Sequence, residues 1–121
     1  MKTIIAGTRT ATAEQTWAAL LSCPWRHEIT GTLCGMAAGA DLHGKAWADA
    51  NKIPVSKWPA NWNVYGKAAG PIRNQQMVDR ADALIAVWDG QSRGTTDVIE
   101  RAKAKGLRVH VFNYVTGEVV E

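Results

Sequence analysis

One stretch of the sequence reads Ala83-Leu84-Ile85-Ala86-Val87-Trp88, and it continues as Asp89-Gly90-Gln91-Ser92-Arg93-Gly94-Thr95. A short, uninterrupted apolar run is typical of a strand buried on both faces of a parallel sheet. The turn after it is rich in glycine, which lets the backbone approach a ligand closely. It leads into a helix predicted from about Thr95 to Lys105. The first N–H groups of such a helix lack partners within it and suit an anion.

Strands and helices are expected to alternate along the whole chain. The apolar runs are Thr3–Ala6, Ile29–Cys34, Pro54–Trp58, Ala83–Trp88 and Leu107–Phe112. Helical patterns begin at Thr12 and cover about Ala40–Asn51, Pro71–Arg80 and Thr95–Lys105. This alternation predicts an α/β fold: a single Rossmann-like domain over residues 1–121, with about five parallel strands and helices on both faces. The strand order 3-2-1-4-5 would place the first and fourth strands side by side.

Details of the helices and connections follow from residue spacing. Thr12 and Gln15 have the spacing of a capping box, and Pro71 suits a first helical position. Pro59–Gly70 is polar, aromatic and long, so it is predicted to be a functional loop. Core positions are expected at Trp17, Leu20, Leu21, Leu42, Ala46 and Trp47, and also at Trp25 and Trp58.

Bulk properties exclude several classes of protein. No apolar run approaches the roughly 18–20 residues that span a bilayer, and no signal-peptide pattern precedes the first strand. Cys23 and Cys34 fit neither a CxxC nor a zinc pattern, so we expect reduced thiols and a cytoplasmic location. His27, His43 and His110 lack the spacing of metal ligands. Neither a metal nor a cofactor is expected.

The position of the cations is more informative than the net charge of +3. Basic residues near the end of the last helix belong to a solvated face: Arg101, Lys103, Lys105 and Arg108. Others lie in glycine-bearing loops or at a predicted helix start: Arg9, Lys67, Arg73 and Arg93. A cation opposes the helix dipole at a helix start, so Arg73 is interpreted as functional. This second set suits an anionic ligand.

Six motifs follow one another along the chain: Gly7-Thr8-Arg9, Gly35-x-Ala37-x-Gly39-Ala40-Asp41, Pro59-Ala60-x-Trp62, Gly66-Lys67-Ala68-Ala69-Gly70-Pro71-Ile72-Arg73-Asn74-x-x-Met77, Ala81-Asp82-Ala83 and Trp88-Asp89-Gly90-x-Ser92-x-Gly94-Thr95. Together they resemble the YspA-related branch of the SLOG superfamily, whose members include LOG and DprA-like nucleotide-binding domains. The resemblance covers about Lys2 to Phe112. It implies a Rossmann-like domain that binds a nucleotide or a nucleotide-derived molecule.

The glycine-rich loops follow predicted strands and therefore meet at one edge of the sheet. Arg9, Arg73 and backbone N–H groups are predicted to hold phosphate, and Trp62 or Met77 to contact a base. The full predicted ligand-binding set is Gly7, Thr8, Arg9, Gly35, Gly39, Ala40, Asp41, Trp62, Lys67, Arg73, Asn74, Met77, Asp89, Gly90, Ser92, Gly94 and Thr95. Some of these residues have a second interpretation. Asp41 and Ser92 are also placed to cap helices, and Trp62 and Tyr65 suit either base stacking or a subunit interface.

Whether the protein is an enzyme depends on an acidic residue. The resemblance to LOG phosphoribohydrolases carries over Arg73, but the position of their glutamate falls on Val98. Asp97 lies one residue earlier, a rotation of about 100° on a helix. If the protein is an enzyme, Arg73, Asp41 and Asp97 are the candidate catalytic residues. We therefore lean towards binding without turnover.

These observations rank three candidate functions. The first is a sensor or sequestering protein for a nucleotide-derived small molecule, such as a phage-type sponge for a defence signal of the cyclic ADP-ribose kind. The second is a LOG-like hydrolase of an N-glycosidic bond. The third, single-stranded nucleic-acid binding, ranks last because no extended basic track is present. The resemblance also implies a homodimer or homotetramer, and no membrane partner is expected.

Overall fold

The computed structural model describes residues 1–121, which form one six-stranded sheet in the order β3-β2-β1-β4-β5-β6. The strands are β1 Lys2–Gly7, β2 Gly31–Cys34, β3 Val55–Lys57, β4 Ala83–Trp88, β5 Arg108–Asn113 and β6 Glu118–Val119. β1 to β5 are parallel, and β6 pairs antiparallel with β5. The predicted fold class and the order 3-2-1-4-5 are confirmed, and β6 extends that order at one edge.

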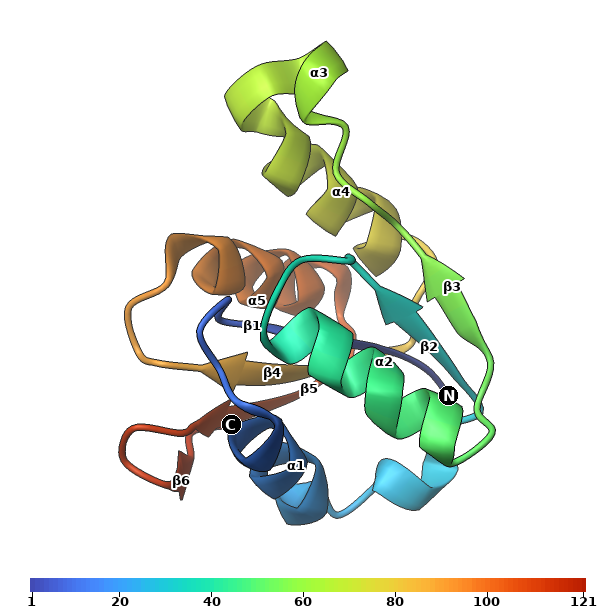
Figure 1. Ribbon diagram of the computed structural model, residues 1–121, viewed down its shortest axis with the longest axis vertical. Helices are drawn as coiled ribbons and strands as arrows, with labels where there is room; N and C mark the ends of the chain where they lie inside the picture. The colour runs from blue at the N-terminus through green and yellow to red at the C-terminus, as the bar shows by residue number, and fades with distance from the viewer.

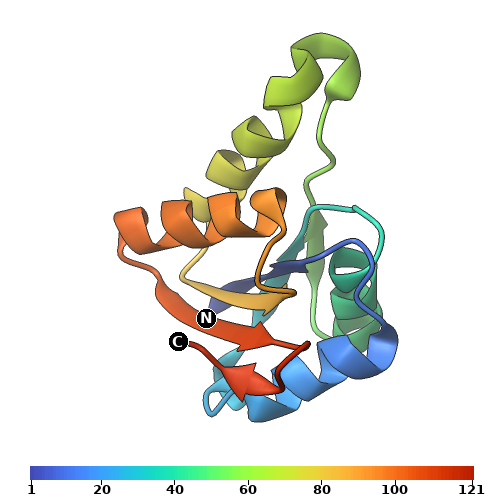
Figure 2. The same cartoon turned by 90° about the vertical axis from the view of Figure 1, so that its left-hand side faces the viewer.

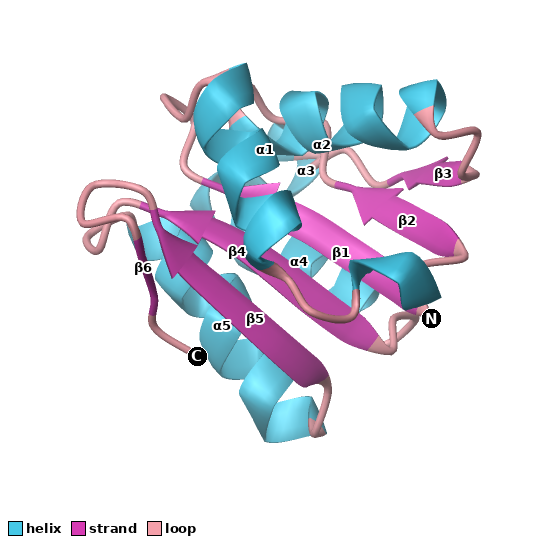
Figure 3. Ribbon diagram, turned by 90° about the horizontal axis from the view of Figure 1, so that it is seen from below, coloured by secondary structure: helices cyan, strands magenta, loops and turns pink.

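Helices cover both faces of the sheet. The α-helices are α1 Ala13–Ser22, α2 Ala40–Ala50, α3 Trp62–Tyr65, α4 Ala69–Val78 and α5 Arg93–Lys105, and short 3-10 helices span η1 Arg26–Glu28 and η2 Gly66–Ala68. α1 and α2 lie on one face and α4 and α5 on the other (Figures 1 and 3). None of the helices combines the length and the apolar character needed to cross a membrane.

Alternate residues of the central strands supply the two halves of the core. Ile4 and Leu84 pack with Met77 and Val98 beneath α4 and α5. Their neighbours Ile5 and Ile85 pack with Leu20 on the opposite face, beneath α1. Because side chains alternate along a strand, each of these strands is buried on both faces. This explains the uninterrupted apolar runs in the sequence.

The predicted core face of α1 is correct only at Leu20. Trp17 is 46% exposed and Leu21 67% exposed, whereas Thr16 is buried. The Thr16 hydroxyl donates to the carbonyl of Thr12, 2.9 Å away, so this polar side chain is satisfied inside the core. The buried face of α1 therefore consists of Thr16, Ala19 and Leu20.

The predicted core face of α2 is wrong. Leu42 is 42% exposed, Ala46 is exposed and Trp47 is only half-buried, while Gly44 and Ala48 are buried. A side chain at Gly44 would place its Cβ only 2.4 Å from Cγ2 of Ile5. α2 therefore approaches the sheet through its smallest residues, Leu42 lies outside, and Trp47 packs only against the edge of the core. Of the four tryptophans expected in the core, Trp25 is buried, and Trp58 is half-buried like Trp47.

Pro59–Gly70 is not a long loop. It contains α3, η2 and the first residues of α4, and in Figure 2 this part of the chain projects beyond the sheet. The capping box of Thr12 and Gln15 is present at the start of α1. Because α4 begins at Ala69, Arg73 lies in the interior of the helix. The interpretation of Arg73 as a cation at a helix start is therefore wrong, and its role has to be judged from its contacts.

Candidate functional site

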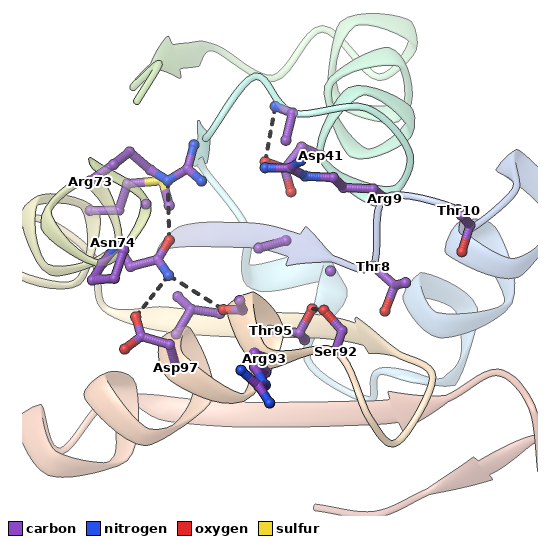
Figure 4. A pocket seen from close by; sticks show the side chains of 18 of the residues that line it. Thr8, Arg9, Thr10, Asp41, Arg73, Asn74, Ser92, Arg93, Thr95 and Asp97 are labelled. Carbon is purple, nitrogen blue, oxygen red and sulfur yellow. Dashed lines mark hydrogen bonds between the residues drawn. The ribbon is translucent and has the colours of Figure 1, made fainter. Parts of the chain in front are cut away.

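A cavity of about 580 Å³ lies beyond the carboxyl ends of β1 and β4 (Figure 4). This volume is within the usual range for a small-molecule site. The residues that line the cavity come from the end of β1 and the loop after it, the β2–α2 loop and the start of α2, helices α3 and α4, and the start of α5. They are Ala6, Gly7, Thr8, Arg9, Thr10, Ala37, Asp41, Trp62, Gly70, Pro71, Arg73, Asn74, Met77, Ser92, Arg93, Gly94, Thr95, Asp97 and Val98.

The N-terminus of α5 forms one wall of the cavity. The first backbone N–H with a partner inside the helix is that of Thr96, which donates to Ser92 at 3.0 Å. The N–H groups of Arg93, Gly94 and Thr95 donate to no group of the chain. Ser92 provides no side-chain cap, and its hydroxyl accepts from that of Thr95. Free amides at a helix N-terminus form a binding place for an anion.

The loop before α5 is shaped by Asp89. Its Oδ1 accepts from the backbone N–H groups of Gln91 and Ser92, at 2.8 and 2.7 Å. The bond from Ser92, followed by that from Gln91, lowers the pKa of the Asp89 carboxyl. Gly90 has φ +87°, and the N–H of Asp89 donates to the Thr8 hydroxyl. Asp89 and Gly90 thus fix the loop conformation without lining the cavity.

Arg73 reaches the cavity from α4. Its Nη1 donates to the carbonyl of Gly35 at 2.5 Å, and its Nε donates to Oδ1 of Asn74 at 3.1 Å. Burial lowers the pKa of the guanidinium. A Cβ at Gly35 would lie 2.6 Å from Nη1 of Arg73, so only glycine leaves room for this contact. Arg73 is in this way held in one orientation, while its Nη2 has no partner in the chain.

Asp41 is a buried carboxyl group in the wall of the same cavity. It is only 4% exposed, and its Oδ2 accepts from the N–H of Ala37 at 3.2 Å. Burial raises the pKa of Asp41 to about 6, although Ala37 and Arg73 act in the opposite direction. The N-cap position of α2 is Gly39. Asp41 therefore closes the preceding loop and does not cap the helix.

A second acid, Asp97, belongs to a polar chain that joins α4 to α5. Asn74 donates through Nδ2 to Oδ2 of Asp97 at 2.9 Å, and Arg101 donates through Nε to the same oxygen at 2.9 Å. Arg101 also donates to Oε1 of Gln75. Asp97 lines the cavity, but Arg101 neutralises its charge.

The remaining cations of the cavity have no acidic partner. Neither Arg9 nor Arg93 takes part in an ion pair. The Arg9 guanidinium carbon lies 5.9 Å from the centroid of the Trp62 ring, a cation–π distance. Figure 4 shows Arg9 reaching from the end of β1 towards Asp41 and Arg73. The site thus presents free positive charge to any bound molecule.

A smaller cavity of about 300 Å³ adjoins the first. Four residues line both cavities: Arg9, Ala37, Trp62 and Arg73. The smaller cavity adds Gly35, Met36, Ala38, Pro59 and Ala60. The two cavities are therefore parts of one larger depression.

Most of the predicted site residues meet at this depression. Gly39, Ala40, Lys67, Asp89 and Gly90 do not line either cavity. Lys67 is exposed in η2, and Gly39 has φ +77° where two loops cross. Seven residues that line the larger cavity were absent from the predicted ligand-binding and catalytic sets: Ala6, Thr10, Ala37, Gly70, Pro71, Arg93 and Val98. Ala37, Gly70 and Pro71 belong to the quoted motifs, Thr10 directly follows one, and Arg93 was counted among the cations that suit an anionic ligand. Val98 was noted only as the position of the LOG glutamate, and no local pattern distinguishes Ala6.

Comparison with known proteins bears on the fold. No model of a protein family matches the chain, and no curated protein matches it. A solved structure of DNA processing protein A (DprA) from Streptococcus pneumoniae superposes with a TM-score of 0.72 at 16% sequence identity. The match covers 93% of this chain and 50% of that one. The fold is DprA-like. At this level of identity the similarity describes the backbone architecture, and the chain spans about half the length of DprA.

Proposed function

We propose that the protein binds a nucleotide-derived small molecule in the cavity at the carboxyl ends of β1 and β4, as a sensor or sequestering protein. One observation carries the proposal. Arg93, Gly94 and Thr95, whose backbone N–H groups have no partner in the chain, line the same cavity as Arg9 and Arg73. Backbone amides and arginine forks are the groups that proteins use to hold phosphate. The DprA-like fold is consistent with the resemblance to the YspA-related branch of the SLOG superfamily, which forms part of this proposal.

The charge balance of the cavity favours an anion. Arg9, Arg73 and Arg93 line it, and the two acids present are Asp41 and Asp97. Asp97 is paired with Arg101, and burial makes ionisation of Asp41 costly. A phosphate group would therefore meet a net positive surface.

The base of the ligand has one suitable partner. Met77 is almost completely buried and forms part of the core, whereas Trp62 is 49% exposed at the edge of both cavities. A base stacked on an aromatic side chain gains about 1–3 kcal/mol. Trp62 is thus the better candidate of the two. Such a protein would hold a signalling nucleotide, for instance a cyclic ADP-ribose derivative produced as a defence signal.

The test is to mix purified protein with NAD-derived, mononucleotide and cyclic-dinucleotide ligands, measure the free ligand, and identify what is released on denaturation by mass spectrometry. Intact ligand released in stoichiometric amount supports the proposal. Arg73→Gln should abolish retention, while Arg80→Gln, in the exposed turn after α4, should not. The proposal fails if no ligand is retained, or if Arg73→Gln retains as much as the wild type.

A second candidate, hydrolysis of an N-glycosidic bond, is favoured by the environment of Asp41. A carboxyl group with a pKa of about 6 in a cavity beside an arginine has the properties of a general acid. Against this, Val98, at the position of the LOG glutamate, is buried in the core. Free base accumulating beyond the protein concentration would establish turnover. If Asp41→Asn and Asp97→Asn both retained that turnover, neither acid would be catalytic.

A further inference from the structure

The two adjoining cavities differ in chemistry. The larger contains the free amides of α5, the hydroxyls of Thr8 and Thr95, and a buried acid. The smaller contains none of these. Its own side chains are Met36, Ala38, Pro59 and Ala60, which are small or apolar, and the Trp62 ring forms part of its wall. A depression of this kind suits a flat, uncharged ring, because only such a group gains from contact with apolar side chains and an aromatic face.

The border between the cavities carries two positive charges. Arg9 and Arg73 line both cavities, and neither forms an ion pair. Arg73 uses Nε and Nη1 on Asn74, Gly35 and Trp58, which leaves Nη2 free. Burial is the main cause that lowers the pKa of Arg73; Asp41 acts in the opposite direction, and the positive charge of nearby Arg9 lowers the pKa further. Two converging cations are stabilised by an anion placed between them.

We propose that the ligand has two ring-bearing parts joined by a phosphate bridge: one nucleoside in the larger cavity, the bridge between Arg9 and Arg73, and a second ring in the smaller cavity beside Pro59. This second ring is the base that stacks on Trp62. This inference rests on the proposed function, because it assigns the class of molecule that the same site takes. A mononucleotide occupies the larger cavity alone and leaves the smaller one empty. A phosphate-bridged dinucleotide fills both.

The experiment compares two probes by isothermal titration calorimetry. They are a set of nucleoside monophosphates and the pyrophosphate-linked dinucleotides built from the same nucleosides. We expect the best dinucleotide to bind about 5- to 150-fold more tightly than the corresponding mononucleotide, the range of one stacked ring. Ala60→Trp and Ala38→Trp fill the smaller cavity from different segments and should reduce dinucleotide affinity to that of the mononucleotide. Mononucleotide affinity should stay unchanged, since neither residue lines the larger cavity.

The control is Ala18→Trp, an equally large substitution on the exposed face of α1, which should leave the affinity for both probes unchanged. Circular dichroism of each variant checks that it folds, and two positions are used so that one failure to fold does not decide the result. Equal affinity for both probes, with no effect of either filling substitution, would overturn the two-part ligand and leave the proposed function standing. Failure of both probes to bind the wild type would overturn the proposed function and this inference with it.

Discussion

At the scale of single residues, the most consequential position is Gly35. Its missing side chain leaves a space into which both Nη1 of Arg73 and Oδ2 of Asp41 extend, since a Cβ there would lie 2.6 Å from the first and 2.7 Å from the second. The two charged groups nevertheless form no ion pair. Asp41 therefore loses hydration without gaining a strong partner, which accounts for the direction of its pKa shift.

Asp41 is expected to make stability depend on pH. Its pKa is 3.8 in an unfolded chain and about 6 in the fold, so the fold favours the neutral carboxyl. The free energy of unfolding should fall by about 2 kcal/mol through this group as the pH rises from about 4 to 7. Asp41→Asn, which mimics the neutral acid, removes this loss.

Urea unfolding of the wild type and of Asp41→Asn at pH 4 and pH 7 measures the effect. The difference in the free energy of unfolding between the two proteins should grow in favour of the variant towards pH 7. Comparing the proteins removes the contributions of Asp79 and Asp89, whose lowered pKa values act in the opposite sense. A constant difference across the range would show that Asp41 is ionised as readily in the fold as in the unfolded chain.

Arg73 should contribute to anion binding through its geometry as well as its charge. Arg73→Lys keeps the charge but loses the planar fork that bonds both Gly35 and Asn74. We expect the affinity for a nucleoside monophosphate to fall by about 1.5–3 kcal/mol, the value of hydrogen bonds to a charged group. Calorimetric titration checks this, and wild-type affinity in the lysine variant would contradict it.

At the scale of elements, the crossing of the β1–α1 and β2–α2 loops depends on Gly39. Its φ is +77°, and a Cβ there would lie 2.3 Å from the backbone oxygen of Arg9. Gly106 offers a matched comparison, because its φ is +81° and a Cβ there meets nothing within 4 Å. Gly106→Ala should cost about 1–2 kcal/mol for the left-handed backbone alone.

Gly39→Ala should cost clearly more than Gly106→Ala, because it adds a collision between two backbone segments to the same conformational penalty. Chemical unfolding of both variants gives the comparison. Equal losses would mean that the loops separate easily and that the wall of the cavity is not rigid.

The helices and strands were predicted best where burial in the fold leaves a clear apolar pattern in the sequence. β4 coincides with the predicted Ala83–Trp88, because a strand buried on both faces leaves a continuous apolar run. The inward face of α2 was mispredicted because Gly44 allows a close approach that hydrophobic spacing does not register. β6 was not predicted, since a two-residue edge strand has no recognisable pattern.

The candidate site was predicted at its loops but not in its internal contacts. Gly7, Thr8 and Arg9 follow a strand and could be placed at the sheet edge from that fact alone. The bond from Asn74 to Asp97 joins two helices, and no spacing within one segment reveals it. Asp89 was predicted to bind the ligand, but it accepts from the N–H groups of Gln91 and Ser92. These bonds depend on the conformation of the turn, which local sequence patterns do not reveal.

At the scale of the whole molecule, the distribution of charge bears on nucleic-acid binding. Three unpaired arginines gather in one cavity: Arg9, Arg73 and Arg93. If single-stranded DNA binds there, it should release few counterions. The slope of log affinity against log salt should be no steeper than about −2, that is, 0.7 for each of three phosphates. Fluorescence anisotropy with a labelled oligonucleotide measures it, and a markedly steeper slope would reveal an extended binding track.

The outermost part of the molecule is the α3 helix at the far end of α4 (Figure 2). Trp62 lies beside Arg9 at the edge of both cavities and is the one tryptophan that lines them. A molecule bound in either cavity therefore lies close to its ring. The indole therefore acts as a built-in optical reporter. Its emission should change on occupancy, so a Trp62→Phe variant would lose the signal and show how much of the total change comes from the ring itself.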